Sequence, residues 1–273
     1  MSEPIIVGIS GGVDSSVAAT ILKEQGHQIE CVFMKNWEGD DDFCTAEDDY
    51  KDALAVCNSI DIPLRSKNFS KQYWDKVFKN FIEEYSKGRT PNPDVLCNKE
   101  VKFNAFLNYA MDLGGIKIAT GHYARIKYSG KKFQLHKGVD QDKDQSYFLY
   151  LLNQEVLSKS LFPLGELHKS EVRKIAEKNN LINFSKKDST GICFIGEQRL
   201  FKEFLKKYIP SSPGMIRSVD GEMCGEHDGL SYYTIGQRKG LGIGGGYGNN
   251  QDPWFVSDKD LENNILIVSQ GIR

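Results

Sequence analysis

Apolar runs and amphipathic segments alternate along the first 120 residues of the chain. The apolar runs are short and rich in β-branched residues, which is typical of buried strands, and they cover 5–10, 29–35, 64–69 and 117–120. The segments between them space apolar residues at helical intervals, which predicts helices at 15–25, 45–59, 71–87 and 99–112. Strands that alternate with helices favour an α/β fold, a Rossmann-like parallel sheet with helices on both faces.

The pattern changes in the second half of the chain. Residues 124–138 alternate between apolar and polar around Ser129-Gly130, which predicts a β-hairpin. Helices are predicted after it, at 145–157, 168–179 and 197–207. From Pro210 onward glycine, proline and polar residues dominate. The sequence therefore predicts an α/β domain over 1–207 followed by a small, mostly β domain over 208–273.

Composition and charge narrow the class of protein. The chain has 273 residues, 40% of them hydrophobic, and a net charge of −2, so an RNA site would have to be a local basic patch. No apolar run reaches the roughly 18 residues of a membrane span, and the N-terminus lacks the pattern of a signal peptide. The six cysteines are widely spaced and form no C-x-x-C pair, so we expect a reducing, cytoplasmic location and no structural metal.

The stretch ISGGVDSS at 9–16 stands between a predicted strand and a predicted helix. A helix N-terminus binds anions, Gly11 and Gly12 allow a phosphate to approach the backbone, and three serines add hydroxyl donors. The stretch lacks both the lysine of a P-loop and the G-x-G-x-x-G of a dinucleotide-binding fold, so it suits a pyrophosphate that leaves. It resembles the pyrophosphate loop of the ATP pyrophosphatase superfamily. That resemblance implies an adenine nucleotide alpha hydrolase-like fold and adenylation of an oxygen by ATP.

Two of the cysteines lie in polar, glycine-containing surroundings just outside predicted helices, Cys97 and Cys193. A helix N-terminus and the nearby Lys99 and Lys102 would favour a thiolate at Cys97. Cys31 and Cys57 fall on apolar faces and are predicted to be inert core residues, whereas Cys44 and Cys224 suggest no role. From these residues alone, a catalytic pair and two bystander thiols both remain open.

Five longer stretches decide between them by resemblance: PNPDVLCNKEVKF, ATGHYARI, KDQSYFLY, STGICFIGE and YYTIGQRKGLGIGG. In this order they resemble the tRNA-specific 2-thiouridylase family. The resemblance implies a sulfurtransferase that adenylates O2 of the wobble uridine in tRNA and then replaces that oxygen with sulfur. Cys193 would carry the sulfur as a persulfide received from a donor protein. Cys97 would release it, leaving a Cys97–Cys193 disulfide for a reductant to reset.

The resemblance also implies the site residues. ATP, with Mg²⁺ on its phosphates and with Asp14 as a candidate ligand, would bind Gly8, Ile9, Ser10, Gly11, Gly12, Val13, Asp14, Ser15, Met34 and Gly121. The tRNA would contact Asn92, Pro93, Asp94, His122, Lys143, Asp144 and Gln145, with Asp94 also a candidate acid–base group. Family members continue into a C-terminal β-barrel that helps to hold tRNA. This sequence stops at VSQGIR, so we expect that barrel to be absent from it. How tightly this chain binds tRNA is therefore a question that the resemblance does not answer.

Other interpretations of these residues stay open at this point. NPD alone also fits a plain turn, the KDQ stretch a charged helix start, and His122 a structural histidine. The acidic run 40–42 fits a solvated loop better than a metal site. Arg238 and Lys239 could bind phosphates. Tyr232 and Tyr233 could either stack on a ligand or pack within the protein. Two other functions also remain: a tRNA-binding protein without catalysis, and an amide-forming ligase that needs neither Cys97 nor Cys193.

Overall fold

A computed structural model describes residues 4–38, 46–188, 201–243 and 252–271. The chain divides into two compact units, the first formed by 1–78 and 93–196 and the second by 79–92 and 197–273. The described residues 201–207 belong to the second unit, whereas the sequence predicted them to be part of the first domain. The second unit also includes a segment from the first half of the chain, which no local pattern indicated.

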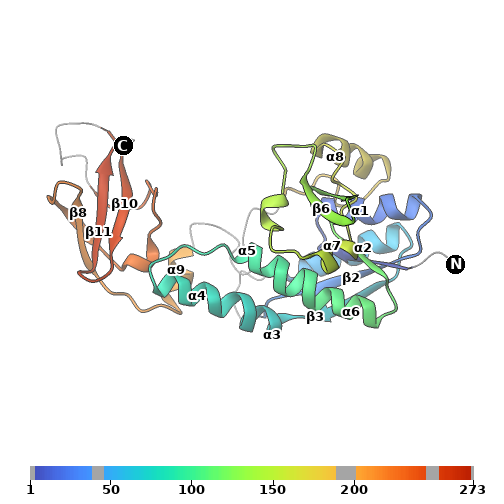
Figure 1. The fold of residues 1–273 in the computed structure, drawn as a ribbon, viewed down its shortest axis with the longest axis horizontal. Coiled ribbons are helices and arrows are strands. Elements are labelled where there is room, and N and C mark those ends of the chain that lie inside the picture. Colours follow the sequence, from blue (N-terminus) through green and yellow to red (C-terminus); the bar gives the residue numbers. More distant parts are fainter. Residues whose placement is uncertain (1–3, 39–45, 189–200, 244–251, 272–273) are drawn as a thin grey trace. The chain divides into compact units, whose positions relative to one another are not determined.

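The first unit contains a parallel sheet in the order β3-β2-β1-β4-β7 (Figure 1). Its strands are β1 (Ile5–Ile9), β2 (Ile29–Lys35), β3 (Leu64–Asn68), β4 (Lys117–Ala119) and β7 (Ser160–Leu161). Every pairing in this sheet is parallel. The predicted parallel sheet is confirmed, and only the two-residue edge strand β7 was not predicted.

Helices pack against both faces of this sheet. Val7 and Ile9 of β1 lie in an apolar core with residues of α1 (Val13–Glu24), α2 (Ala46–Ser59) and α8 (Lys169–Lys178). Gly8, which alternates with them, faces the other side, where the Phe106 ring of α6 (Phe106–Asp112) lies over it. The Rossmann-like expectation is thus confirmed.

One helix on this second face begins earlier than predicted. α5 (Pro93–Leu96) runs on through the π-helical η2 (Cys97–Ala105) into α6, whereas the sequence predicted a loop up to Cys97. Proline is favoured in the first turn of a helix, because its fixed φ suits that position and its missing N–H would have no helical partner there. The NPD stretch is therefore a helix start rather than a plain turn.

The other helices and the hairpin follow the prediction in part. The predicted helix 71–87 is α3 (Ser70–Tyr73), the π-helical η1 (Trp74–Phe78) and α4 (Lys79–Ser86) in succession. The helix predicted at 145–157 is wrong, because the chain forms the 3₁₀ turn η3 (Ser146–Phe148) and then α7 (Gln154–Ser158), which Asn153 caps by accepting from the Val156 N–H. The hairpin of β5 (Ala124–Ser129) and β6 (Lys132–Lys137) is confirmed.

The second unit is mostly β, as predicted. Its sheet has the order β10-β11-β8-β9, formed by β8 (Gly214–Ser218), β9 (Met223–His227), β10 (Trp254–Asp260) and β11 (Ile265–Gln270). The 3₁₀ turn η5 (Leu230–Tyr232) and α9 (Phe201–Lys206) complete it, and the Phe201 ring contacts Phe81 and Tyr85 of α4. Within the described ranges of both units, no helix has the length and apolar character to cross a membrane.

Candidate functional site

A cleft of about 400 Å³ opens in the first unit where β1 and β4 end. The chain leaves these neighbouring strands for opposite directions along the sheet, and such a switch point is where α/β sheets bind ligands. Eight of the ten residues predicted to bind ATP line the cleft: Gly8, Ser10, Gly12, Val13, Asp14, Ser15, Met34 and Gly121. Ile9 and Gly11 do not line the cleft, because Ile9 lies in the apolar core and Gly11 is buried.

The loop after β1 is held by its own hydroxyl groups. The Ser10 N–H donates to Ser15 Oγ at 3.1 Å, and the Ser15 and Ser16 hydroxyls donate to the Gly12 carbonyl at 3.1 and 2.9 Å. Gly121 at the end of β4 packs on the start of α1 so closely that a Cβ would lie 2.7 Å from the Ser15 nitrogen. The ends of the two strands are therefore fixed against each other, with the N-terminus of α1 at the cleft.

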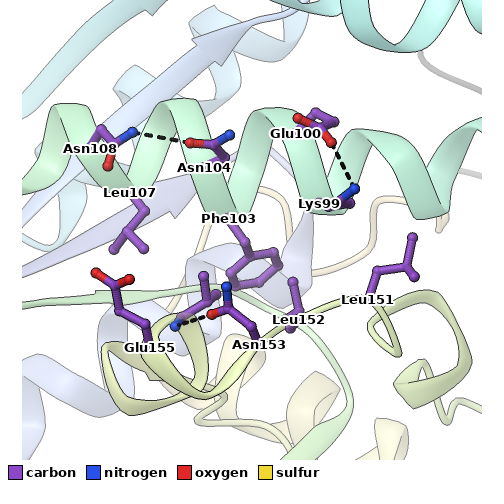
Figure 2. A pocket seen from close by; sticks show the side chains of 11 residues that line it. Lys99, Glu100, Phe103, Asn104, Leu107, Asn108, Leu151, Leu152, Asn153 and Glu155 are labelled. Atoms are coloured by element: carbon purple, nitrogen blue, oxygen red, sulfur yellow. Dashed lines mark hydrogen bonds and ion pairs between the residues drawn. The ribbon is translucent and has the colours of Figure 1, made fainter.

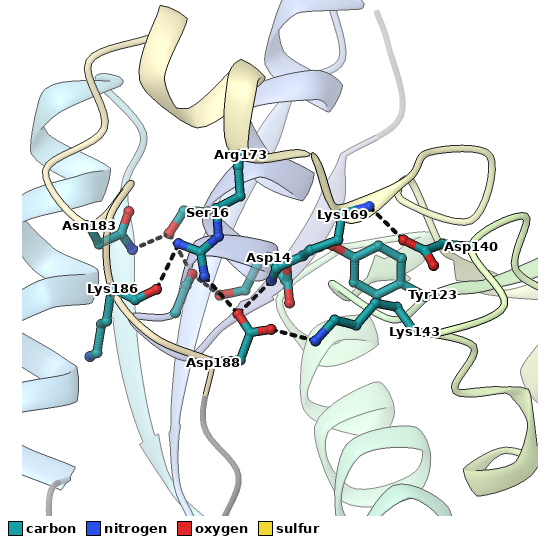
Figure 3. A network of polar contacts seen from close by, with 12 residues as sticks. Asp14, Ser16, Tyr123, Asp140, Lys143, Lys169, Arg173, Asn183, Lys186 and Asp188 are labelled. Atoms are coloured by element: carbon teal, nitrogen blue, oxygen red, sulfur yellow. Dashed lines mark hydrogen bonds and ion pairs between the residues drawn. The ribbon is translucent and has the colours of Figure 1, made fainter. Parts of the chain in front are cut away.

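An ion network forms one wall of this cleft (Figure 3). The Lys169 ammonium lies 2.7 Å from Asp14 Oδ1 and 2.7 Å from Asp188 Oδ1, and its side chain is only 13% exposed. The Tyr123 hydroxyl also donates to Asp14 Oδ1 at 2.8 Å. An aspartate in the middle of a phosphate-binding loop would repel phosphate, and Lys169 offsets that charge.

Asp188 gathers three cations around one carboxylate. It pairs with Lys143 at 2.8 Å and Arg173 at 2.9 Å in addition to Lys169. Burial by itself would raise the pKa of Asp188, but the hydrogen bonds from Lys143 and Lys169 outweigh it and lower the pKa to about 2. The carboxylate is therefore ionised throughout the neutral range and holds both lysines at the cleft.

Three of the residues predicted to contact tRNA line the same cleft, His122, Lys143 and Gln145. His122 is 9% exposed and its Nδ1 lies 2.7 Å from the Thr120 hydroxyl. Burial, with a smaller effect of Lys102, holds the pKa of His122 well below its usual value, so the ring is neutral at neutral pH. The Asp144 carboxylate instead accepts the backbone N–H groups of Gly138 and Ser146, which gives it a structural role in the turn.

The segment 92–97 is less accessible than the sequence suggested. Asn92 is exposed, Pro93 is buried and Asp94 is half-buried. Burial raises the pKa of Asp94 above the ordinary carboxylate value, and the Lys102 charge opposes part of that rise. Lys102 also lines the cleft, so the charge of Lys102 connects Asp94 electrostatically with the cleft. Cys97 is only 1% exposed and lies one turn inside the helix, so the predicted position at a helix N-terminus is wrong.

Comparison with known proteins assigns this architecture to a family. Residues 3–197 match the model described as "tRNA methyl transferase HUP domain", and 202–270 match "tRNA methyl transferase PRC-barrel domain". The chain is 60% identical to a tRNA-specific 2-thiouridylase of Hydrogenovibrio crunogenus over 98% of this chain and 71% of that protein. It is 62% identical to a tRNA-specific 2-thiouridylase of Geobacillus kaustophilus, over 98% of this chain and 72% of that protein. The chain belongs to the tRNA-specific 2-thiouridylase family.

Several residues singled out in the sequence lie outside the described ranges. Cys193, Cys44 and the acidic run 40–42 lie there. Of the described cysteines, Cys31 and Cys57 are buried in the core, as predicted, and Cys224 is buried on β9, where the sequence suggested a polar loop. Tyr232 and Tyr233 pack rather than stack in the open, since both are buried and the Tyr232 hydroxyl donates to the Ile209 carbonyl at 2.7 Å.

A second cleft of about 240 Å³ lies between the η2–α6 helix and residues 151–156 (Figure 2). Phe103, Leu107 and Leu152 give it an apolar floor. The polar groups drawn at its rim bond to one another, as in the Lys99–Glu100 pair at 3.1 Å and the Asn104–Asn108 pair at 3.1 Å. Among the described residues, no serine or threonine lines it, and its one lysine is paired with Glu100. The first cleft is therefore the candidate site of this thiouridylase.

Three residues of the site were missed by sequence reasoning: Lys169, Asn183 and Asp188. Lys169 meets Asp14 across 155 positions of sequence, and Asn183 meets Gly11 across 172. Neither contact leaves a local pattern, and KSEVRKIA reads simply as an amphipathic helix. The one available signal was Asp14, a negative charge in an anion-binding loop, but as a candidate Mg²⁺ ligand it did not indicate a protein cation.

Proposed function

We propose that this chain is a tRNA 2-thiouridylase, a sulfurtransferase that uses ATP to replace O2 of the wobble uridine with sulfur. The observation that carries the proposal is the phosphate-binding loop at the sheet switch point in a chain of the thiouridylase family. The loop offers backbone and hydroxyl donors without a P-loop lysine, which suits retention of a leaving pyrophosphate.

The reaction has two halves. In the first, uridine O2 attacks the α-phosphate of ATP, pyrophosphate leaves, and the O2–AMP bond converts a poor leaving group into a good one. In the second, the terminal sulfur of a Cys193 persulfide attacks C2 and AMP departs. The Cys97 thiolate then attacks the Cys193 sulfur, which frees the thiocarbonyl and forms a Cys97–Cys193 disulfide. An external dithiol supplies the two electrons that reset the pair.

Individual residues support these roles by position. Asp94, whose pKa burial raises, is suited to exchange a proton with the base, and Lys102, whose charge acts on Asp94, lines the cleft. Lys143 and His122 lie at the cleft, where an extruded uridine would meet the α-phosphate. Asn92 is exposed directly before the helix that Pro93 opens, where a target base could contact its amide.

Magnesium would accompany ATP on its phosphates. The Asp14 and Asp188 carboxylates line the cleft beside serine hydroxyls, and oxygen donors of this kind fit Mg²⁺. Asp14 already accepts from Lys169 and Tyr123, so in this arrangement its main partner is the lysine rather than a metal. A sulfur-donor protein and tRNA are the partners that this function requires, and the cytoplasm is its expected location.

The test is thiouridine formation in unmodified tRNA with ATP, magnesium, a sulfane-sulfur (persulfide) donor and a dithiol reductant, with pyrophosphate measured alongside. Mass spectrometry of the nucleosides separates thiolation from the methylation that the family-model description names. Thiouridine with equal pyrophosphate is the expected result. Tight tRNA binding with neither product would favour the binding-only alternative, and pyrophosphate release driven by ammonia without tRNA would favour the ligase.

A further inference from the structure

The peptide between Gly11 and Gly12 is the most easily reoriented unit of the phosphate-binding loop. Gly11 has φ +77, and glycine reaches either hand of the backbone at little cost. No peptide in the described ranges is cis, so the Gly11 carbonyl and the Gly12 N–H point in opposite directions. If the peptide turned over, a carbonyl oxygen would replace an N–H donor at the phosphates.

One side chain holds this peptide from behind. Asn183 is 5% exposed, and its Nδ2 donates to the Gly11 carbonyl at 2.9 Å and to Ser16 Oγ at 3.0 Å (Figure 3). With that carbonyl turned inward, the Gly12 N–H faces the Ser10 hydroxyl at 3.4 Å, and both residues line the cleft. Asn183 itself does not line the cleft, so it acts on a ligand only through the loop.

The segment that carries Asn183 is itself anchored. The Arg173 guanidinium donates to the Phe184 and Lys186 carbonyls, each at 2.8 Å, and Lys186 pairs with Asp49 at 2.9 Å. Asp49 also bounds the loop, because a Cβ at Gly11 would lie 2.4 Å from its carbonyl oxygen. The Asn183 amide is thus presented to the Gly11 carbonyl by a fixed support rather than by a mobile surface loop.

We infer that Asn183 is a positioning residue of the nucleotide site, which keeps the Gly12 N–H directed at the pyrophosphate by holding the Gly11 carbonyl. The Asn183 Oδ1 atom is buried and has no hydrogen-bond partner among the described residues. A buried amide with one end unsatisfied costs free energy, so packing alone does not account for an asparagine here. This inference rests on the proposed use of the cleft for ATP.

The test is Asn183→Leu, which keeps the approximate shape of the side chain and removes its donor. Loss of one hydrogen bond that orients a binding group should weaken binding of inorganic pyrophosphate and of ATP roughly tenfold. The KM for tRNA should stay unchanged, because Asn183 is buried behind the loop. Asn179→Leu is the matched control, since Asn179 caps the C-terminus of α8 and its Nδ2 donates to the Ile175 carbonyl at 3.1 Å, and it should leave both nucleotide constants unchanged.

Ser16→Ala provides a second route if Asn183→Leu folds poorly. It removes the other acceptor of the Asn183 amide and the bond to the Gly12 carbonyl, so it should weaken pyrophosphate binding severalfold, and the affinity is measured well below the lowered unfolding temperature, where the variant is fully folded. Wild-type affinity in a folded Asn183→Leu protein, or equal losses for nucleotide and tRNA, would overturn the inference. A wild-type protein that releases no pyrophosphate with tRNA would instead overturn the proposed function.

Discussion

The two ends of the candidate site differ in how far they are prepared for chemistry. At the phosphate-binding end, serine hydroxyls and the start of α1 are fixed at the cleft and Lys169 offsets the charge of Asp14. At the thiol end, Cys97 is 1% exposed inside a continuous helix and is itself the first of nine residues of π-helix. The nucleotide half is therefore preorganised, whereas in the proposed reaction Cys97 would have to become accessible before it attacked the Cys193 sulfur.

This contrast predicts that adenylation and sulfur transfer can be separated by mutation. Cys193→Ser should abolish thiouridine formation because no sulfur can be carried, while ATP-dependent pyrophosphate release on tRNA persists. Cys224→Ser is the control, since Cys224 is buried on β9 in the second unit, and it should retain both products. Quantifying thiouridine and pyrophosphate in the same reaction checks this. Undiminished thiouridine formation by Cys193→Ser would contradict the proposal that Cys193 carries the sulfur.

Removing the cation of the prepared end should damage the other half-reaction. Lys169→Met leaves Asp14 at the cleft without its lysine partner, and the repulsion between one carboxylate and nearby phosphates should weaken ATP binding roughly 10- to 100-fold. Calorimetric titration with ATP measures the change.

Two further variants make that experiment specific. Lys174→Met removes an exposed charge from the same helix and should leave ATP affinity within about twofold. Adding Asp14→Asn to Lys169→Met should recover much of the lost affinity, because the repelling charge is then gone. A double variant no better than Lys169→Met would mean that the lysine contacts the phosphates itself.

Two glycines with similar backbone conformations allow the packing around the phosphate-binding loop to be measured. Gly11 and Gly26 have φ +77 and +81, but a Cβ at Gly11 would strike the Asp49 carbonyl, whereas a Cβ at Gly26 meets nothing within 4 Å. Gly26→Ala should cost about 1 kcal/mol of unfolding free energy from the left-handed backbone alone. Gly11→Ala should cost about 2 kcal/mol more from overpacking. Urea denaturation measures both, and equal losses would show that the loop yields easily.

The smallest expected effect concerns the ion network. The lowered pKa of Asp188 means that its pairing stabilises the fold fully above the unfolded carboxylate pKa of about 4, and that this contribution is lost as pH falls through about 2. Asp188→Asn should therefore cost about 1–2 kcal/mol of unfolding free energy at pH 7, and the difference from wild type should shrink below pH 4. A difference that is constant with pH would assign the loss to packing.

The sequence predicted the parts of this site that follow from local pattern and from resemblance. The run IIVGI and the glycines after it indicated strand, loop and helix start within two residues. Burial of Cys97 was not predictable in the same way, because PNP was read as a stiff loop when Pro93 in fact opens the helix. Lys169 and Asn183 were missed because their partners lie more than 150 positions away, and only the tertiary fold brings them together.

The measurement that tests the central claim most directly uses tRNA whose target uridine carries a heavy oxygen isotope at O2. If the prepared end of the site adenylates that oxygen, the label appears in AMP in step with thiouridine formation, and none appears in pyrophosphate or water. The proposed function predicts that result. Label released as water, with unlabelled AMP, would show that ATP activates another group and would contradict it.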